Sequence, residues 1–280
     1  MVVDLLHEFE LGVWKAIFTH TMRILNAIGG NVVQDLNKRY REVPPFGNGT
    51  IRRFTGNPSA MHKLAARDFE DLLQVGTPRW LLVDIAYHIY AQCALPVFED
   101  LLLTQSENAC LRNLLFDLAT WHAYAKLRLH TDTTLNEFRT ITTTLGRSVR
   151  TFIKEVCSQY RTTELPNEMA ARGRRAAALA KSSHTPGASR RGASKKTLKS
   201  KPKKLNLSTY KYHALGDYPD LVARFGTTDN ASTQTVRVFL ENTWTFSVSD
   251  LCTGRTTTQD DQTSLSTYEQ KTLRLSACNG

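Results

Sequence analysis

Residues 8–29 read EFELGVWKAIFTHTMRILNAIG, and this stretch decides the fold class because its apolar residues recur at helical spacing. Gly29, followed by another glycine, supplies a helix end. The apolar residues expected on one face are Phe9, Val13, Ile17, Met22 and Leu25. Similar spacing recurs in four later stretches, the last of which opens with Thr and Asp suited to capping. These stretches are 60–74, 93–103, 108–130 and 131–166. We therefore expect a mainly α fold, with a helical module over residues 1–166.

The composition is that of a globular protein, with 41% hydrophobic and 9% aromatic residues in a chain of 280. Five cysteines are scattered without a C-x-x-C pair, which argues against zinc knuckles and favours a reducing compartment. No uninterrupted apolar run reaches the roughly 18 residues of a membrane span. We expect no signal peptide, no membrane partner and no small-molecule substrate.

The net charge of +10 is concentrated in one segment. Between Arg172 and Lys204 there are 12 Lys or Arg residues and no acid, which leaves about −2 for the rest of the chain. Gly, Ser, Pro and Lys dominate residues 167–207, so this segment is expected to be a flexible linker that can include a short helix over 167–181. Folded character returns over residues 208–235.

The basic segment can neutralise phosphates, but such charge reads no base sequence. DNA bound weakly and without sequence preference is therefore one expected partner. The run KKTLKSKPKK (195–204) also resembles a nuclear-import address, whereas a linker kept soluble by its charge would leave the protein in the cytoplasm. The residues expected to contact nucleic acid are Arg172, Arg174, Arg175, Arg190, Arg191, Lys195, Lys196, Lys199, Lys201, Lys203 and Lys204.

Two further sets of polar residues bear on metal binding. Asp4 and His7 follow a short apolar run, where a carboxylate can hold Mg²⁺ or can simply cap the next helix. His122 and His130 are eight residues apart, and no Cys or carboxylate is seen to complete a metal set around them. Both histidines are therefore expected to be packing or surface residues, and no metal site is predicted.

Several ordered segments resemble Plavaka-type fungal transposase-like proteins, relatives of the CACTA group of DDE transposases. They are VVDLLHEFELGVWKAIFTH, FGNGTIRRF, AARDFEDLLQ, CALPVFEDLL, LATWHAYAKLRLHTDTTL and LNLSTYKYHALGDYPDLVARFGTTDNASTQT, which together span most of residues 1–74 and 93–235. The resemblance implies an RNase H-like nuclease in which two Asp and one Glu hold Mg²⁺, with a helical insertion before the Glu. Asp4-Leu5-Leu6-His7 matches the Asp-x-x-His pattern of the second Asp. The resemblance places the first Asp before Met1.

Two stretches depart from the family's pattern. After STQT (232–235) the family continues with Gly-Glu-Leu-Glu-His, which contains the expected third metal ligand, whereas this chain does not. Residues 254–271, GRTTTQDDQTSLSTYEQK, back-translate with chosen codons and a one-base shift into a run beginning Gly-Glu-Leu-Gln-His. We therefore expect residues 236–280 to be a disordered tail that derives from a retained intron and a shifted frame. Residues 75–92 are expected to be intron-encoded as well, or else a genuine extra helix.

The resemblance thus implies a helical insertion module with only a remnant of the nuclease sheet, in a truncated and catalytically inactive transposase-derived protein. Asp4 and His7 would be vestigial, and no cofactor is expected although the intact family uses Mg²⁺. Two alternatives remain: a non-sequence-specific nucleic-acid-binding protein, and a helical scaffold that pairs with full-length relatives.

Overall fold

The computed structural model describes residues 4–45, 52–61, 64–73, 94–182 and 199–228, all within one compact unit, Met1–Ser232. Every regular element in these ranges is a helix, and one isolated β-bridge joins Thr163 to Pro202. The mainly α prediction is therefore confirmed. The segments 75–92 and 236–280, for which intron origins are predicted, lie outside the described residues.

The first long helix is continuous but changes its winding. A π-helical stretch, η1 (Leu6–Trp14), runs directly into α1 (Lys15–Ile28), which ends at Gly29 with φ 79°. The predicted helix over 8–29 is thus confirmed, including its glycine end. Helix α2 (Val32–Glu42) follows, and it was not predicted. Its buried apolar residues are only Leu36 and Tyr40, too few for a recognisable stripe.

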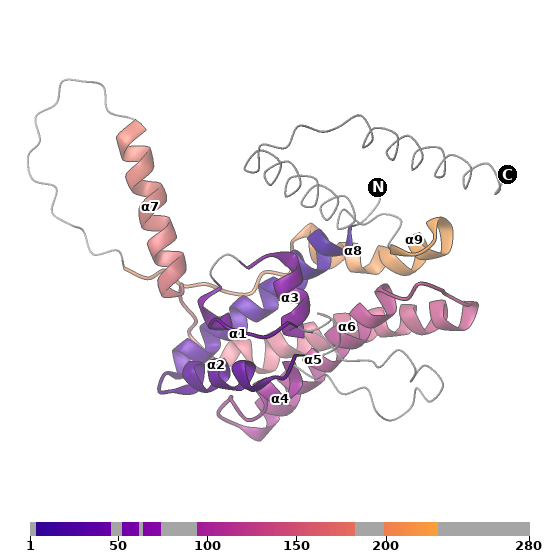
Figure 1. The fold of residues 1–280 in the computed structure, drawn as a ribbon, viewed down its shortest axis with the longest axis horizontal. Helices are drawn as coiled ribbons and strands as arrows, with labels where there is room; N and C mark the ends of the chain where they lie inside the picture. The colour runs from indigo at the N-terminus through magenta and orange to yellow at the C-terminus, as the bar shows by residue number, and fades with distance from the viewer. Residues whose placement is uncertain (1–3, 46–51, 62–63, 74–93, 183–198, 229–280) are drawn as a thin grey trace, which may run out of the picture. The chain divides into compact units, whose positions relative to one another are not determined.

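The next elements are short. They are η2 (Pro58–Ala60), α3 (Ala66–Leu73) and α4 (Ala94–Phe98), so the helices predicted over 60–74 and 93–103 form only in part. Two long helices, α5 (Gln105–Ala125) and α6 (Asp132–Glu155), then lie side by side (Figure 1). Thr131 caps α6, as its position before the apolar pattern predicted.

Aromatic side chains form the centre of the core. The Trp121 ring stacks on Phe9 at a centroid distance of 4.8 Å and meets the Tyr218 ring edge-on at 5.0 Å. The indole N–H of Trp14 donates to the Phe69 carbonyl over 2.7 Å, which satisfies its buried donor. These contacts join η1, α3 and α5 to a segment near residue 218.

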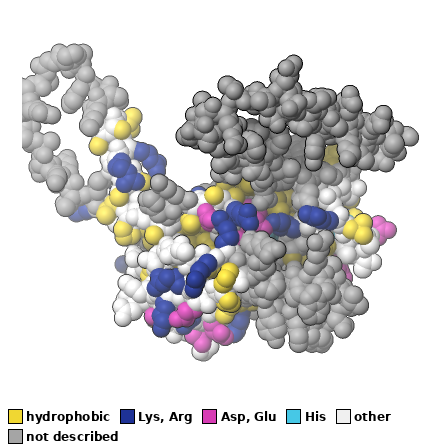
Figure 2. Space-filling model, in the orientation of Figure 1, with side chains coloured by type: hydrophobic (Ala, Val, Ile, Leu, Met, Phe, Trp, Pro, Cys, Tyr) yellow, Lys and Arg dark blue, Asp and Glu magenta, His cyan; other side chains and the backbone are white. Residues whose placement is uncertain are grey.

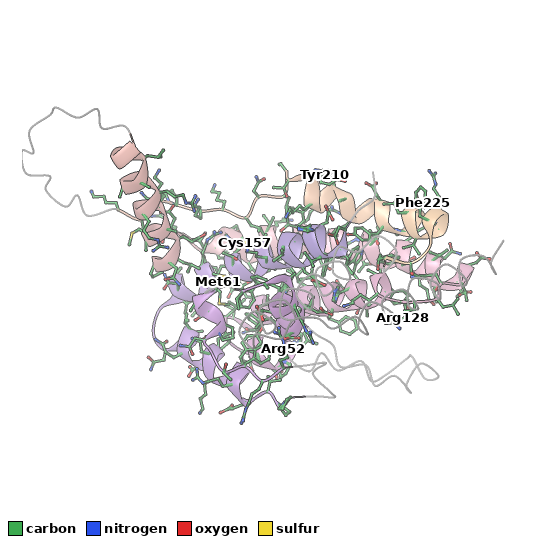
Figure 3. The ribbon with its side chains drawn as sticks, turned by 45° about the horizontal axis from the view of Figure 1, so that its top comes forward. Arg52, Met61, Arg128, Cys157, Tyr210 and Phe225 are labelled. Atoms are coloured by element: carbon green, nitrogen blue, oxygen red, sulfur yellow. The ribbon has the colours of Figure 1, made fainter. Side chains whose placement is uncertain are left out.

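That late segment is part of the helical core. It consists of α8 (Tyr210–Ala214), η4 (Leu215–Asp217) and α9 (Tyr218–Phe225). Helix α8 lies against η1 at Gly12, where a Cβ atom would stand 2.6 Å from Lys211 Cδ. The absence of a side chain at this glycine therefore permits the close approach. Tyr210 and Phe225, labelled in Figure 3, remain exposed at the two ends of the segment.

Both described ends of the predicted linker have defined structure. Helix α7 (Pro166–Ser182) includes the short helix predicted over 167–181. After the gap, the chain pairs with the segment beyond η3 (Cys157–Gln159): Glu164 N donates to Lys201 O over 2.8 Å, and Lys203 N donates to Thr162 O over 3.0 Å. Residues 199–204 are therefore held against the residues before α7 and do not form a free linker.

No described helix combines the length and the apolar character that crossing a membrane would require.

Candidate functional site

Asp4, the expected vestigial metal ligand, caps the first helix. Its Oδ1 accepts the Leu6 backbone N–H over 3.2 Å, and the Glu8 carboxylate accepts the Asp4 N–H over 2.7 Å. Its Oδ2 lies 2.6 Å from His7 Nδ1, on a side chain that is 57% exposed. This geometry corresponds to the capping interpretation of Asp4. Asp4 belongs to no group of three possible metal donors among the described residues.

The basic segment is only partly available for a ligand. Arg172 donates from Nε and Nη2 to Glu164 Oε2 over 3.1 and 2.8 Å, and Lys203 Nζ lies 3.9 Å from the other oxygen of this buried carboxylate. The hydrogen bond from Arg172 lowers the pKa of Glu164. The expected contact residues whose side chains are exposed are Arg174, Arg175, Lys199, Lys201, Lys203 and Lys204. Those outside the described residues are Arg190, Arg191, Lys195 and Lys196.

The two histidines of α5 and its flank have different surroundings. His130 is half-buried beside Phe138, with ring centroids 6.0 Å apart, and burial lowers the pKa of its imidazole. Its packing role matches the prediction. His122 is also a packing residue, stacked on Phe9, but the structure brings two carboxylates to it from distant parts of the chain. The prediction that no carboxylate completes a donor set around His122 is therefore wrong.

We call Glu10, Glu70 and His122 the buried donor cluster. Their exposed fractions are 2%, 7% and 5%, and one donor atom from each lies within 4.8 Å of the others. His122 Nε2 is 3.3 Å from Glu10 Oε1, while the Lys126 ammonium forms an ion pair with Glu70 Oε1. The Phe9 ring stacks on the imidazole at 5.0 Å and closes one side. This cluster contains the elements of a metal site.

A common local pattern places these three side chains in the core. Each directly follows a fully buried aromatic residue: Phe9 precedes Glu10, Phe69 precedes Glu70, and Trp121 precedes His122. Glu10 also lies four residues before the buried Trp14, which is about one turn of this π-helical stretch, so the two side chains share its buried face. An acid on an apolar helical face is the sequence signal that could have indicated the site.

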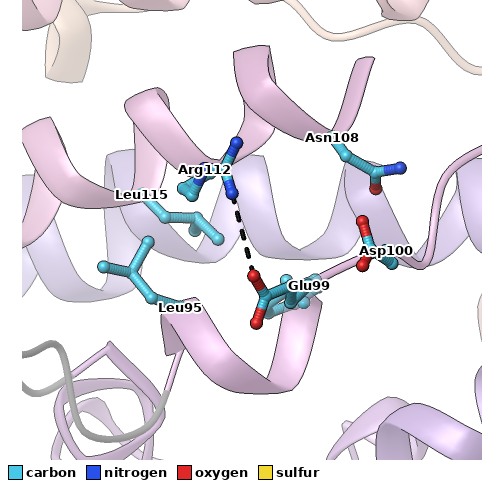
Figure 4. Close-up of a pocket in the computed structure, with 7 residues that line it drawn as sticks. Leu95, Glu99, Asp100, Asn108, Arg112 and Leu115 are labelled. Carbon is cyan, nitrogen blue, oxygen red and sulfur yellow. Dashed lines mark ion pairs between the residues drawn. The ribbon is translucent and has the colours of Figure 1, made fainter. Parts of the chain in front are cut away.

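Two hollows lie elsewhere on the described structure. Glu99 and Arg112 span the first with an ion pair of 3.7 Å, and the space between them holds about one water molecule (Figure 4). The second is a groove beside Arg52, whose guanidinium is already bound by Asp68 and Asp71 at 2.6 Å each. Neither presents a set of convergent groups comparable to the buried donor cluster.

The described cysteines are not activated for chemistry. Cys110 and Cys157 are free and half-buried, and burial raises the pKa of Cys157 to about 12. A thiol with this pKa is almost entirely protonated at neutral pH and is a poor nucleophile.

The chain matches no protein-family model, no curated protein and no solved structure. The resemblance to transposase-like proteins therefore stays a prediction.

Proposed function

We propose that this chain is a catalytically inactive, transposase-derived protein that binds nucleic acids without sequence preference, with the nucleus as its site of action. The binding surface would be the basic arm, defined as α7 together with residues 199–204. The observation that carries the proposal is the set of exposed cations on this arm, where no acid interrupts the sequence between Arg172 and Lys204.

The arm presents its charge from a defined position. Arg172 and Lys203 both form ion pairs with Glu164. These ion pairs hold the start of α7 against the extended residues 199–204. The remaining cations then extend outward, and Figure 2 shows Lys and Arg side chains on α7. In an extended segment, residues two apart such as Lys199 and Lys201 are about 6.6 Å apart along the chain. Because residues two apart on an extended segment face the same side, both ammonium groups can contact phosphates of one strand.

The proposal that the chain is catalytically inactive rests on the hydrogen bonds that Asp4 makes at the start of the first helix. Two-metal phosphoryl transfer requires several carboxylates that converge on the ions. Asp4 instead accepts the Leu6 amide and contacts His7, and its Oδ atoms serve a helix start. A vestigial Asp-x-x-His motif with a capping role is consistent with a chain that no longer cuts or joins DNA.

The binding test compares two sets of four neutralising substitutions. The arm variant carries Arg174→Gln, Arg175→Gln, Lys201→Gln and Lys204→Gln, which spare the two cations bound to Glu164. The matched control carries Arg147→Gln, Arg150→Gln, Lys154→Gln and Arg161→Gln, which lie at exposed positions on and after α6. Binding to two unrelated DNA duplexes is measured by fluorescence anisotropy over a range of salt concentrations.

We expect the arm variant to bind both duplexes more weakly. The slope of log K against log salt should fall by up to about 0.9 for each phosphate contact removed. The α6 control should behave like the unmodified chain. If only the α6 control loses binding, a helix of the folded core carries the site and the proposal fails. Cleavage in Mg²⁺ or Mn²⁺ that disappears in Asp4→Ala would contradict inactivity.

A further inference from the structure

We propose that Glu10, Glu70 and His122 bind one divalent transition-metal ion of the Zn²⁺ type inside the helical core. This site is separate from the basic arm and from Asp4. It would hold together η1, α3 and α5, which supply one ligand each and are far apart in the sequence.

The donor chemistry favours zinc over magnesium. An imidazole with two carboxylates is a mixed nitrogen and oxygen set, which suits Zn²⁺ and its neighbours in the first transition row. Mg²⁺ prefers oxygen ligands alone and keeps several waters, for which a core site with under 10% exposure at each ligand offers little room.

The spacing already approaches that of a metal site. In a tetrahedral zinc site with bonds of about 2.1 Å, neighbouring donor atoms lie about 3.4 Å apart. His122 Nε2 and Glu10 Oε1 are 3.3 Å apart, and all three donors lie within 4.8 Å of one another. To close the remaining distance, the Glu70 carboxylate would have to turn from the Lys126 ammonium towards the other two donors. A water molecule would complete the fourth position.

An unpaired oxygen provides the independent argument for a ligand. Glu10 is 2% exposed, and its Oε2 has no hydrogen-bond partner within the described residues. A buried carboxylate oxygen without a partner is costly, because it has lost its hydration and gained nothing in return. A dication between Glu10 and His122 would supply the missing contact.

Local charge also favours a cation. The two carboxylates lie together in the core, and the Lys126 ammonium that pairs with Glu70 is on a side chain that is 33% exposed. A purely structural network would pair His122 with Glu10 and Lys126 with Glu70. Such a network still leaves Glu10 Oε2 without a donor, whereas a metal ion does not.

The test titrates Zn²⁺ into the full chain after removal of metal with a chelator. A chromophoric competitor reports affinity and stoichiometry, and thermal unfolding reports stabilisation. We expect one Zn²⁺ per chain and a higher unfolding midpoint, because an ion that binds only the folded state stabilises it. Glu10→Gln and His122→Asn should each weaken binding by at least about tenfold.

His130→Asn is the matched control, because His130 is a half-buried histidine near the same helix and outside the buried donor cluster. Its zinc affinity should equal that of the unmodified chain. Lys126→Gln should bind Zn²⁺ about tenfold more tightly, since the ammonium no longer competes for Glu70. This variant keeps all three ligands and so tests the site even if a ligand substitution prevents folding.

Visible absorption of the Co²⁺-loaded chain gives a second readout, because ligand-field bands report nitrogen and oxygen donors at the ion. Those bands should be absent in His122→Asn and present in His130→Asn. The proposal is overturned if the unmodified chain binds no Zn²⁺. It is equally overturned if Glu10→Gln and His122→Asn fold and bind Zn²⁺ as tightly as the unmodified chain. Loss of DNA binding in the arm variant has no bearing on these outcomes.

Discussion

Glu10 in the core and Glu164 at the start of the basic arm are both buried carboxylates, but the chain treats their charge differently. Glu164 receives two N–H groups of Arg172, the Lys201 backbone N–H and the ammonium of Lys203. Glu10 receives one contact from His122, and its second oxygen has none within the described residues. The comparison distinguishes a carboxylate that the chain itself neutralises from one whose surroundings are suited to an added cation.

The largest expected change in stability comes from removing an aromatic side chain of the core around Glu10. Trp121→Ala should reduce the free energy of unfolding by about 3–5 kcal/mol, because the ring is fully buried between Phe9, Phe138 and Tyr218. Urea unfolding measures this loss. Leu129→Ala, at a residue that is 78% exposed, should change stability by less than about 0.5 kcal/mol. Equal effects of the two substitutions would show that the aromatic centre does not carry the core.

A second prediction concerns another buried titratable group of the core, His20. It is 1% exposed with both ring nitrogens unpartnered in the described structure, and burial, with Arg23 adding to it, lowers its pKa from 6.5 to about 4. The unfolded chain therefore takes up this proton first as the pH falls. The free energy of unfolding should therefore be highest above pH 6.5 and should fall by up to about 3 kcal/mol as the pH is lowered to about 4.

His20→Leu should remove this acid sensitivity, because leucine fills similar space and carries no proton. The measurement is the urea midpoint of both proteins between about pH 7 and about pH 4. Parallel curves for the two proteins would assign the acid sensitivity to other groups. His20 then contrasts directly with His122, because the His122 imidazole has a carboxylate partner while neither ring nitrogen of His20 has a hydrogen-bond partner within the described residues.

The smallest expected effect lies at the arm. The pKa of Glu164 is lowered from 4.5, chiefly by the hydrogen bond from Arg172, so its contribution to stability is present above pH 4.5 and lost as the pH falls through the lowered value. Glu164→Gln should be less stable at neutral pH and less dependent on pH in the acid range. Glu42→Gln, at an exposed carboxylate paired with Lys38, is the control and should change neither. If the stability of Glu164→Gln depends on acid pH as strongly as that of the unmodified chain, then the charge of Glu164 does not stabilise the arm.

The features that could be predicted from the sequence are those that depend on residues close together in the chain. The helix over 8–29, its glycine end and the cap of α6 follow from residues within a few positions of one another. Helix α2 was missed because few of its residues are buried. The buried donor cluster was missed because Glu10 and His122 are 112 residues apart, and no pattern along the chain states that they meet. Glu164 and Lys201 are 37 residues apart and also meet through tertiary pairing, which local spacing along the sequence does not predict.

The contact between Lys211 Nζ and the His7 carbonyl spans 204 residues and has a consequence for the chain during its synthesis. At roughly 5–20 residues per second, a ribosome needs about 10–40 s to proceed from the first partner to the second. During that interval the surface of η1 around Gly12 stays exposed. The face of Trp121 that Tyr218 later covers is exposed as well. The nascent chain therefore offers an aromatic surface to chaperones until α8 and α9 emerge. Shortening the chain before residue 210 would make that exposure permanent.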